Sequence, residues 1–222
     1  MRNILIIAGG LVAVAAIAAG VYFGTRPATT GPTPVPAAAS AAPDKAAILT
    51  VQPGDHVEGD PNAPITLIEY ASFTCPHCAH FNTMELPELK KKWIDTGKVK
   101  LVYRDFPLDE TAARAAQLAQ CAGNDRYFAV VDMIFRGQAN WATASDPLAE
   151  LAKSFRIAGM GEKEVKACLA NATVADGVIN SYRMGEQAGV DSTPTLFING
   201  VKYTGARSLE ELDAAFGKLL NK

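Results

Sequence analysis

The feature that most constrains this chain is a pair of cysteines two residues apart, placed directly after an apolar run. The run Ile65–Tyr70 is interrupted only by Thr66 and Glu69, a pattern typical of a strand buried on both faces. The segment Cys75-Pro76-His77-Cys78 follows it after four residues. The pair is therefore expected just beyond the end of a central strand.

A helical stretch follows the cysteines and is predicted to run to about Thr96, with Gly97 ending it. Alternation of apolar and polar residues over Val99–Arg104 predicts the next strand. Strand, helix and strand at this spacing form a βαβ unit, whose two strands are parallel. Ile48–Val51 and Val57–Glu58 flank Pro53-Gly54-Asp55, which predicts a short entry strand and turn before the central strand.

The remainder of the chain is predicted to be helical and then to return to strands. Residues 109–189 show no strand pattern and predict four or five helices. Thr195–Ile198 and Val201–Thr204 bracket Asn199-Gly200, a strong signal for a tight hairpin, and a last helix is expected from Ser208. The fold class is therefore α/β with an inserted all-helical subdomain, at about residues 109–172.

The N-terminal part differs in composition from the rest. Arg2 precedes the uncharged stretch Ile4–Phe23, which as a helix would span about 30 Å. Residues 1–25 are interpreted first as an uncleaved membrane anchor and second as a cleaved signal segment, with a buried helix as the remaining alternative. Residues 26–46 are rich in Pro and Ala and predict a linker, which leaves 47–222 as the folded domain.

This organisation predicts an exported protein. We expect a periplasmic or other extracytoplasmic location, either anchored to the inner (cytoplasmic) membrane or cleaved and soluble. The chain has 222 residues, enough for one sizeable domain after the N-terminal segment. Its net charge of −2 gives no electrostatic reason to expect a nucleic-acid partner.

The spacing of Cys75 and Cys78 fits thiol–disulfide chemistry. A cysteine at a helix N-terminus is favoured as the thiolate, because unpaired backbone N–H groups stabilise the anion. His77 would add a donor or positive charge, and Pro76 suits the first helical position. Cys75 is therefore predicted as the exposed nucleophile and Cys78 as its buried partner. Stabilising the thiolate favours the reduced form, which makes the disulfide a stronger oxidant.

A zinc site is the alternative interpretation of the two cysteines. His56 or His80 could complete such a site, and the protein would then be a binding or chaperone module. The chain has only three histidines, and its other cysteines are about forty or more residues away. We therefore expect no metal and no cofactor, and we expect His56 and His80 to be surface residues.

The sequence around the cysteine pair resembles the DsbA-like thiol oxidases of bacterial envelopes, within the thioredoxin superfamily. The resemblance rests on Glu69–Cys78, on Tyr103–Leu108, on Thr193–Thr195 and on the helical insert, and it covers about residues 50–220. It implies a thioredoxin fold and donation of disulfides to reduced exported proteins. It also implies re-oxidation by a membrane quinone-linked thiol oxidase.

The resemblance also implies roles for single residues. Pro194 matches the family's cis-proline, which shapes the substrate groove, and Thr193 before it would contact the redox pair. Glu69 matches a buried carboxylate that assists proton transfer, with a surface glutamate at a strand edge as the alternative. A monomeric oxidase is favoured, because residues 26–50 are too short for the dimerisation domain that related isomerases carry. A disulfide isomerase or reductase of the same fold remains the alternative.

Cys121 and Cys168 lie in the helical insert. Outside the cytoplasm a structural disulfide between them is expected, as in a subset of the family that the chain resembles. Two free buried thiols and a regulatory pair are the other possibilities, because sequence alone does not show whether the two cysteines lie within bonding distance.

Overall fold

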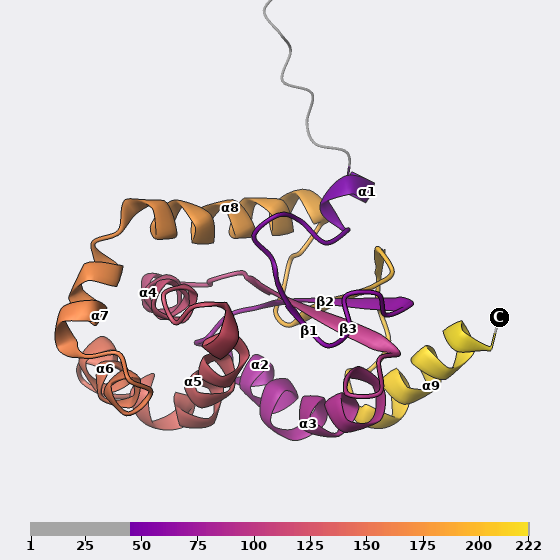
Figure 1. Cartoon of the computed structure of the whole chain (residues 1–222), viewed down its shortest axis with the longest axis horizontal. Coiled ribbons are helices and arrows are strands. Elements are labelled where there is room, and N and C mark those ends of the chain that lie inside the picture. The colour runs from indigo at the N-terminus through magenta and orange to yellow at the C-terminus, as the bar shows by residue number, and fades with distance from the viewer. Residues whose placement is uncertain (1–44, 222) are drawn as a thin grey trace, which may run out of the picture. The chain divides into compact units, whose positions relative to one another are not determined.

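The computed structural model describes residues 45–221, which form a five-stranded sheet with helices on both faces (Figure 1). The strands lie in the order β1-β3-β2-β4-β5. Their bounds are β1 His56–Glu58, β2 Ile65–Ala71, β3 Val99–Asp105, β4 Thr195–Ile198 and β5 Val201–Lys202. Strands β2 and β3 are parallel, as predicted, and every other neighbouring pair is antiparallel.

The helices surround this sheet. Their bounds are α1 Lys45–Ile48, α2 Pro76–His80, α3 Leu86–Leu89, α4 Glu110–Gln120, α5 Tyr127–Trp141, α6 Pro147–Ile157, α7 Glu162–Leu169, α8 Ala172–Ala188 and α9 Leu209–Leu220. Two π-helical turns, Phe81–Glu85 and Lys90–Ile94, continue α2 and α3, and a 3₁₀ turn, Asn124–Arg126, precedes α5. The predicted series of helices between the two groups of strands is confirmed.

The two faces of the sheet are buried by different helices. Leu67 and Leu101 pack with residues of α3 and α9, whereas Ile68, Tyr70 and Val102 pack with residues of α1 and α8. Alternate residues of β2 and β3 point to opposite faces, which explains why nearly every position of both strands is apolar. Among the described strand residues, the only buried charged side chains are those of Glu69, Arg104 and Asp105.

Two local predictions concern the ends of the sheet. The entry strand and turn are found in part: Val57 and Glu58 lie in β1 and Pro53-Gly54 forms a turn, whereas no strand forms over Ile48–Val51, because helix α1 ends at Ile48. The hairpin is confirmed, because Asn199 and Gly200 both have positive φ, of 47° and 78°, as a type I′ turn requires.

The predicted anchor or signal segment and most of the predicted linker lie outside the described residues. Within residues 45–221, no helix is both long and apolar enough to cross a lipid bilayer.

Candidate active site

Cys75 lies at the N-terminal end of helix α2. Strand β2 ends at Ala71, and the chain turns so that the backbone N–H of Cys75 donates to Ser72 O at 3.1 Å. Cys75 is the N-cap residue of α2, with extended backbone angles, and Pro76 occupies the first helical turn. No side chain caps this helix, so its first N–H groups are directed at the Cys75 thiol.

The pKa of Cys75 is lowered to about 5. The largest cause is a hydrogen bond with the Cys78 thiol, and contacts with Thr193 and with the backbone N–H groups of Cys78 and His77 add to it. Cys75 is itself buried, with 6% of its surface exposed, so the expectation of an exposed nucleophile is wrong. This burial opposes the shift, because it disfavours the charged form. The thiolate is therefore the form of Cys75 that predominates at neutral pH.

Cys78 has the opposite environment. Its side chain is fully buried, and burial raises the pKa of its thiol far above the ordinary value. The Cys75 thiol and the charge of Glu69 act in the same direction. The pair therefore consists of one cysteine that favours the thiolate and one that holds its proton.

Glu69 is also fully buried, so the alternative of a surface glutamate is wrong. Its Oε1 accepts a hydrogen bond of 2.7 Å from Asn82 Nδ2, and the same nitrogen donates to the carbonyl oxygen of Cys78 at 3.0 Å. Burial raises the pKa of Glu69 to about 8, although the bond from Asn82 and the charge of Lys90 partly oppose it. Glu69 thus holds a proton at neutral pH, and the side chain of Asn82 links it to the backbone of Cys78.

The Thr193-Pro194 segment lies beside the redox pair. Its peptide bond is cis, and Cys75 Sγ, as a thiol, donates to Thr193 O at 3.4 Å. A pocket of about 220 Å³ opens next to it, lined by Pro194, His77 and Arg207 among others. His77 itself is exposed, and its backbone N–H rather than its ring acts on Cys75.

Two residues at this site were not found by sequence reasoning. Asn82 joins the carboxylate of Glu69 to helix α2, as described above. Gln138, on α5, donates from Nε2 to the carbonyl oxygens of Phe73 and Cys75 at 2.7 and 2.9 Å. Both side chains are amides on helices and have no local signal, because their partners are backbone carbonyls or a residue on another element.

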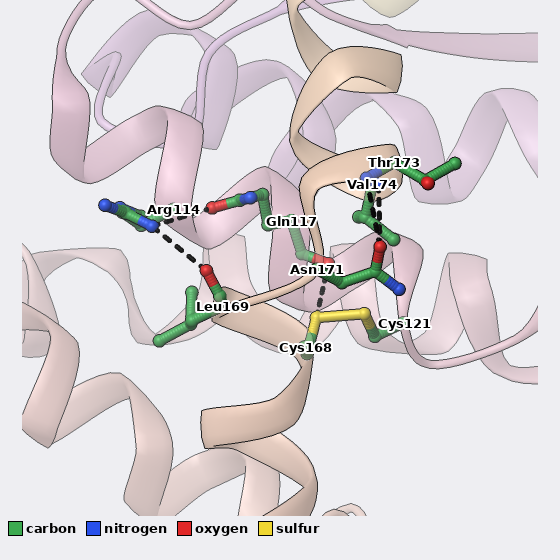
Figure 2. Close-up of a disulfide and its surroundings, with 8 residues drawn as sticks. All are labelled: Arg114, Gln117, Cys121, Cys168, Leu169, Asn171, Thr173 and Val174. Atoms are coloured by element: carbon green, nitrogen blue, oxygen red, sulfur yellow. Dashed lines mark hydrogen bonds between the residues drawn. A yellow bond between two sulfur atoms is a disulfide. The ribbon is translucent and has the colours of Figure 1, made fainter.

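Cys121 and Cys168 are joined by a disulfide in the helical insert (Figure 2). Cys121 ends α4 and Cys168 lies on α7, so the bond ties these two helices together. Around it, Arg114 Nη1 donates to Leu169 O at 3.2 Å, and Asn171 caps α8 by accepting from Thr173 N at 3.0 Å (Figure 2). The disulfide is thus placed where α4, α7 and the start of α8 meet.

The histidines have different surroundings. His80 is exposed, as expected, and lies 3.5 Å from Glu85 Oε1. His56 is not a plain surface residue: it is half-buried, bonded to Gln120 and stacked on Tyr127 at a centroid distance of 3.5 Å. Within the described part of the chain, no three His, Cys, Asp or Glu side chains are grouped as metal ligands.

A parallel βαβ unit that carries a Cys-x-x-Cys pair at the start of its helix, beside a cis-proline, defines a thioredoxin-fold dithiol protein. The family model described as thioredoxin matches residues 51–218. An inferred protein-disulfide oxidoreductase of Rickettsia conorii is 33% identical over 174 residues, which cover 78% of this chain and 62% of that protein. The chain therefore spans less than two thirds of that relative.

Solved structures agree with this class. Wolbachia pipientis alpha-DsbA1 is 30% identical, with a TM-score of 0.74 over 79% of this chain and 96% of that one. A protein-disulfide isomerase from Novosphingobium aromaticivorans is 26% identical, with a TM-score of 0.67 over 78% and 100%. The chain belongs to the DsbA-like thiol–disulfide oxidoreductases of the thioredoxin family, and the expected thioredoxin fold with a helical insertion is confirmed.

Proposed function

We propose that this domain oxidises cysteine pairs in exported proteins by transferring its Cys75–Cys78 disulfide to them. The observation that carries the proposal is the contrast between the two cysteines: the pKa of Cys75 is lowered to about 5, whereas Cys78 is fully buried and retains its proton. A reduced form stabilised in this way makes the disulfide a better oxidant.

The reaction takes two exchange steps. A substrate thiolate attacks Cys75 Sγ, the Cys75–Cys78 bond breaks, and Cys78 leaves with the electron pair and takes up a proton. A second substrate thiolate then attacks the substrate sulfur of the mixed disulfide, and Cys75 leaves as a stabilised thiolate. The substrate has lost two electrons and gained a disulfide, and the domain has become a dithiol.

Several residues receive roles in this proposal. In the oxidation of a substrate, Cys75 is the sulfur attacked and then the leaving thiolate, and Cys78 is the first leaving group. In re-oxidation, Cys75 is the nucleophile and Cys78 is the resolving thiol. Glu69 exchanges the proton of Cys78. Pro76 and the backbone of His77 shape the N-terminus of α2, and Thr193 and Pro194 border the substrate groove. The pocket beside His77 and Pro194 supports this placement of the substrate, since Pro194 lines it and Thr193, the preceding residue, contacts Cys75.

The cellular setting is part of the same proposal. A DsbA-like oxidase in the bacterial envelope, held by residues 1–25 and a linker, would be re-oxidised by a membrane quinone-linked thiol oxidase. The apolar, uncharged stretch Ile4–Phe23 supports the export of the domain. The reduced substrate proteins and the oxidase are the partners that this proposal requires.

The deciding measurement is the redox equilibrium of the Cys75–Cys78 pair with glutathione, followed by alkylation and mass analysis. An oxidase requires a potential well above that of thioredoxin, which is about −270 mV. A thioredoxin-like value would overturn the proposal in favour of a reductase. The double variant Cys121→Ser/Cys168→Ser is the matched control, because it leaves a single redox pair to be titrated.

Disulfide isomerisation is the second candidate, since the similar Novosphingobium aromaticivorans structure is a protein-disulfide isomerase. A substrate with scrambled disulfides separates the two activities. Recovery of the native pairing without added oxidant would identify an isomerase, whereas an oxidase acts on the fully reduced substrate.

A further inference from the structure

A row of polar side chains crosses the sheet on the face that carries Glu69. Tyr103 on β3 is paired in register with Glu69 on β2, and on its other side with His56 on β1. Residues paired across strands point to the same face, and so does a residue two positions further along a strand. Asp105 therefore joins the row, which leads from Glu69 to the outer edge of the sheet.

The outer end of the row opens into a pocket. Gln120 Nε2 donates to Asp105 Oδ2 at 2.8 Å, and Gln120 Oε1 lies 2.7 Å from His56 Nε2. Because an amide oxygen only accepts, His56 Nε2 carries the hydrogen in this pair. A pocket of about 600 Å³ is lined by His56, Tyr103, Asp105 and Gln120, together with residues of α8.

Three buried atoms of this row have no hydrogen-bond partner among the described residues. They are Glu69 Oε2, Tyr103 Oη and Asp105 Oδ1. Buried polar atoms are nearly always paired, so three on one face require an explanation. A tyrosine hydroxyl both donates and accepts, and Tyr103 lies within electrostatic reach of Asp105, Glu69 and Cys78. It is therefore suited to pass a proton between the two carboxyl groups.

On the opposite side of Glu69 a pocket of about 420 Å³ is lined by Asn82 and Lys90, but the side chain that bonds to Glu69 there is an amide. Both hydrogens of Asn82 Nδ2 are used, one by Glu69 Oε1 and one by the carbonyl oxygen of Cys78, and an amide does not titrate. Lys90 beyond it is paired with Glu58 Oε2 at 2.7 Å. The oxygen of Glu69 that remains to exchange a proton is Oε2.

We propose that Tyr103 and Asp105 form a proton path that connects Glu69 to the pocket at the β1–β3 edge. The inference rests on the proposed thiol–disulfide exchange. When the Cys75–Cys78 bond breaks, Cys78 takes its proton from Glu69. No direct hydrogen bond joins Glu69 Oε2, Tyr103 Oη and Asp105 Oδ1, so bridging water carries the proton between them. Glu69 regains a proton by way of the Tyr103 hydroxyl, which gives one proton and accepts another from the side of Asp105, and Asp105 regains its proton from water in the pocket. Re-oxidation drives the same transfers in reverse.

This path separates proton exchange from substrate binding. The pocket at the β1–β3 edge shares no lining residue with the pocket beside His77 and Pro194. A bound substrate that covers Cys75 would therefore leave the proton path open. Burial raises the pKa of Asp105 to about 6, despite the bond from Gln120, which places this carboxyl between solvent and Glu69 in proton affinity.

The other titratable and charged groups near the path are few. Cys75, Cys78 and Lys90 act on Glu69. Near Asp105 they are His56, Tyr127 and the ion pair of Asp55 with Arg104, whose residues line the same pocket.

The test is stopped-flow reduction of the oxidised full-length protein by a small dithiol, in H₂O and D₂O, across the pH range from about 5 to 9. A leaving thiolate of high pKa departs faster when a proton donor is available to it, so Tyr103→Phe should slow the exchange about 10-fold at neutral pH. Asp105→Asn, which still accepts from Gln120, should slow it similarly. Both variants should keep the wild-type redox potential, because a path changes rates and not equilibria.

Tyr127→Phe is the matched control, since it removes another fully buried hydroxyl from the same aromatic cluster. An unchanged rate in Tyr103→Phe, or equal slowing in Tyr127→Phe, would overturn the path. Tyr103→Phe should add no further slowing to Glu69→Gln, and an additive effect would also overturn it. A thioredoxin-like potential with slowed Tyr103→Phe would reject the oxidase proposal alone.

Discussion

Gln138 donates a hydrogen bond of 2.9 Å to the carbonyl oxygen of Cys75, so the helical insert holds the backbone of the nucleophile in place. A second bond from the same nitrogen reaches Phe73 O at 2.7 Å. The two bonds fix the loop between β2 and α2 from outside the thioredoxin core. The insert is therefore part of the active-site scaffold as well as a cover for it.

Replacing Gln138 by Ala should destabilise the protein and weaken the site. Phe73 O would lose the bond from Gln138, whereas Cys75 O would keep the bond from Ala79 N–H at 3.1 Å, so the cost is about 1–3 kcal/mol in the free energy of unfolding. Gln187→Ala, at an exposed position of α8, is the control and should change it little. Urea unfolding of the reduced proteins measures both, and equal stability of the two variants would contradict this role of Gln138.

The two active-site thiols should differ sharply in reactivity. Alkylation of Cys75 by iodoacetamide should reach half its maximal rate near pH 5, where its pKa lies, whereas the buried Cys78 should stay unmodified in the native protein. Mass analysis of digested protein locates the label. A half-point near the ordinary cysteine value of about 8.5 would show that the thiolate is not stabilised.

The pKa of Glu69 predicts a pH-dependent stability. Its folded value of about 8 lies above its ordinary value of 4.5, so the folded state binds the extra proton between these limits. The contribution of Glu69 to stability is therefore fully present below about pH 4.5 and is lost as the pH rises through 8. Glu69→Gln keeps an oxygen for Asn82 but does not titrate.

Thermal unfolding at a series of pH values checks this prediction. The reduced wild type should lose stability relative to Glu69→Gln as the pH rises to about 8 and should then lose no more. Parallel curves for the two proteins would mean that Glu69 is ionised throughout.

The Cys121–Cys168 bond should affect stability rather than catalysis. Its cysteines are 47 positions apart, and closing a loop of this length stabilises the folded state by at most about 4 kcal/mol through chain entropy. Cys121→Ser/Cys168→Ser should therefore unfold at lower urea concentration while it oxidises substrates at a nearly normal rate. Loss of activity with unchanged stability would assign a regulatory role to the pair.

The parts of the fold that sequence predicted are those with a local cause. An apolar strand before Cys75 and a helix after it indicated a parallel βαβ unit, and Asn199-Gly200 indicated the hairpin. Gln138 could not be found in this way. Its bonds to Phe73 and Cys75 join residues 65 and 63 positions apart, and a glutamine on a helix carries no sign of a distant carbonyl partner.

His56 was expected at the surface but is half-buried, again because its partners are distant in the sequence. A histidine near a turn is most often exposed, and nothing nearby in the sequence indicates the ring of Tyr127 or the amide of Gln120. Both come from elements more than sixty positions away. By contrast, the burial of Glu69 was implied by its match to a family position, and not by the apolar pattern that it interrupts.

The chain contains a disulfide of its own, between α4 and α7, so its maturation requires the same chemistry that is proposed as its function. A newly synthesised copy has four thiols, and two bonds among four cysteines can form in three arrangements, of which one pairs Cys121 with Cys168 as the fold does. During maturation, Cys121 must therefore pair with Cys168, and Cys75 with Cys78. If the proposed oxidase activity holds, a finished copy can supply the missing bond to the next, and the pool of mature protein would promote its own growth.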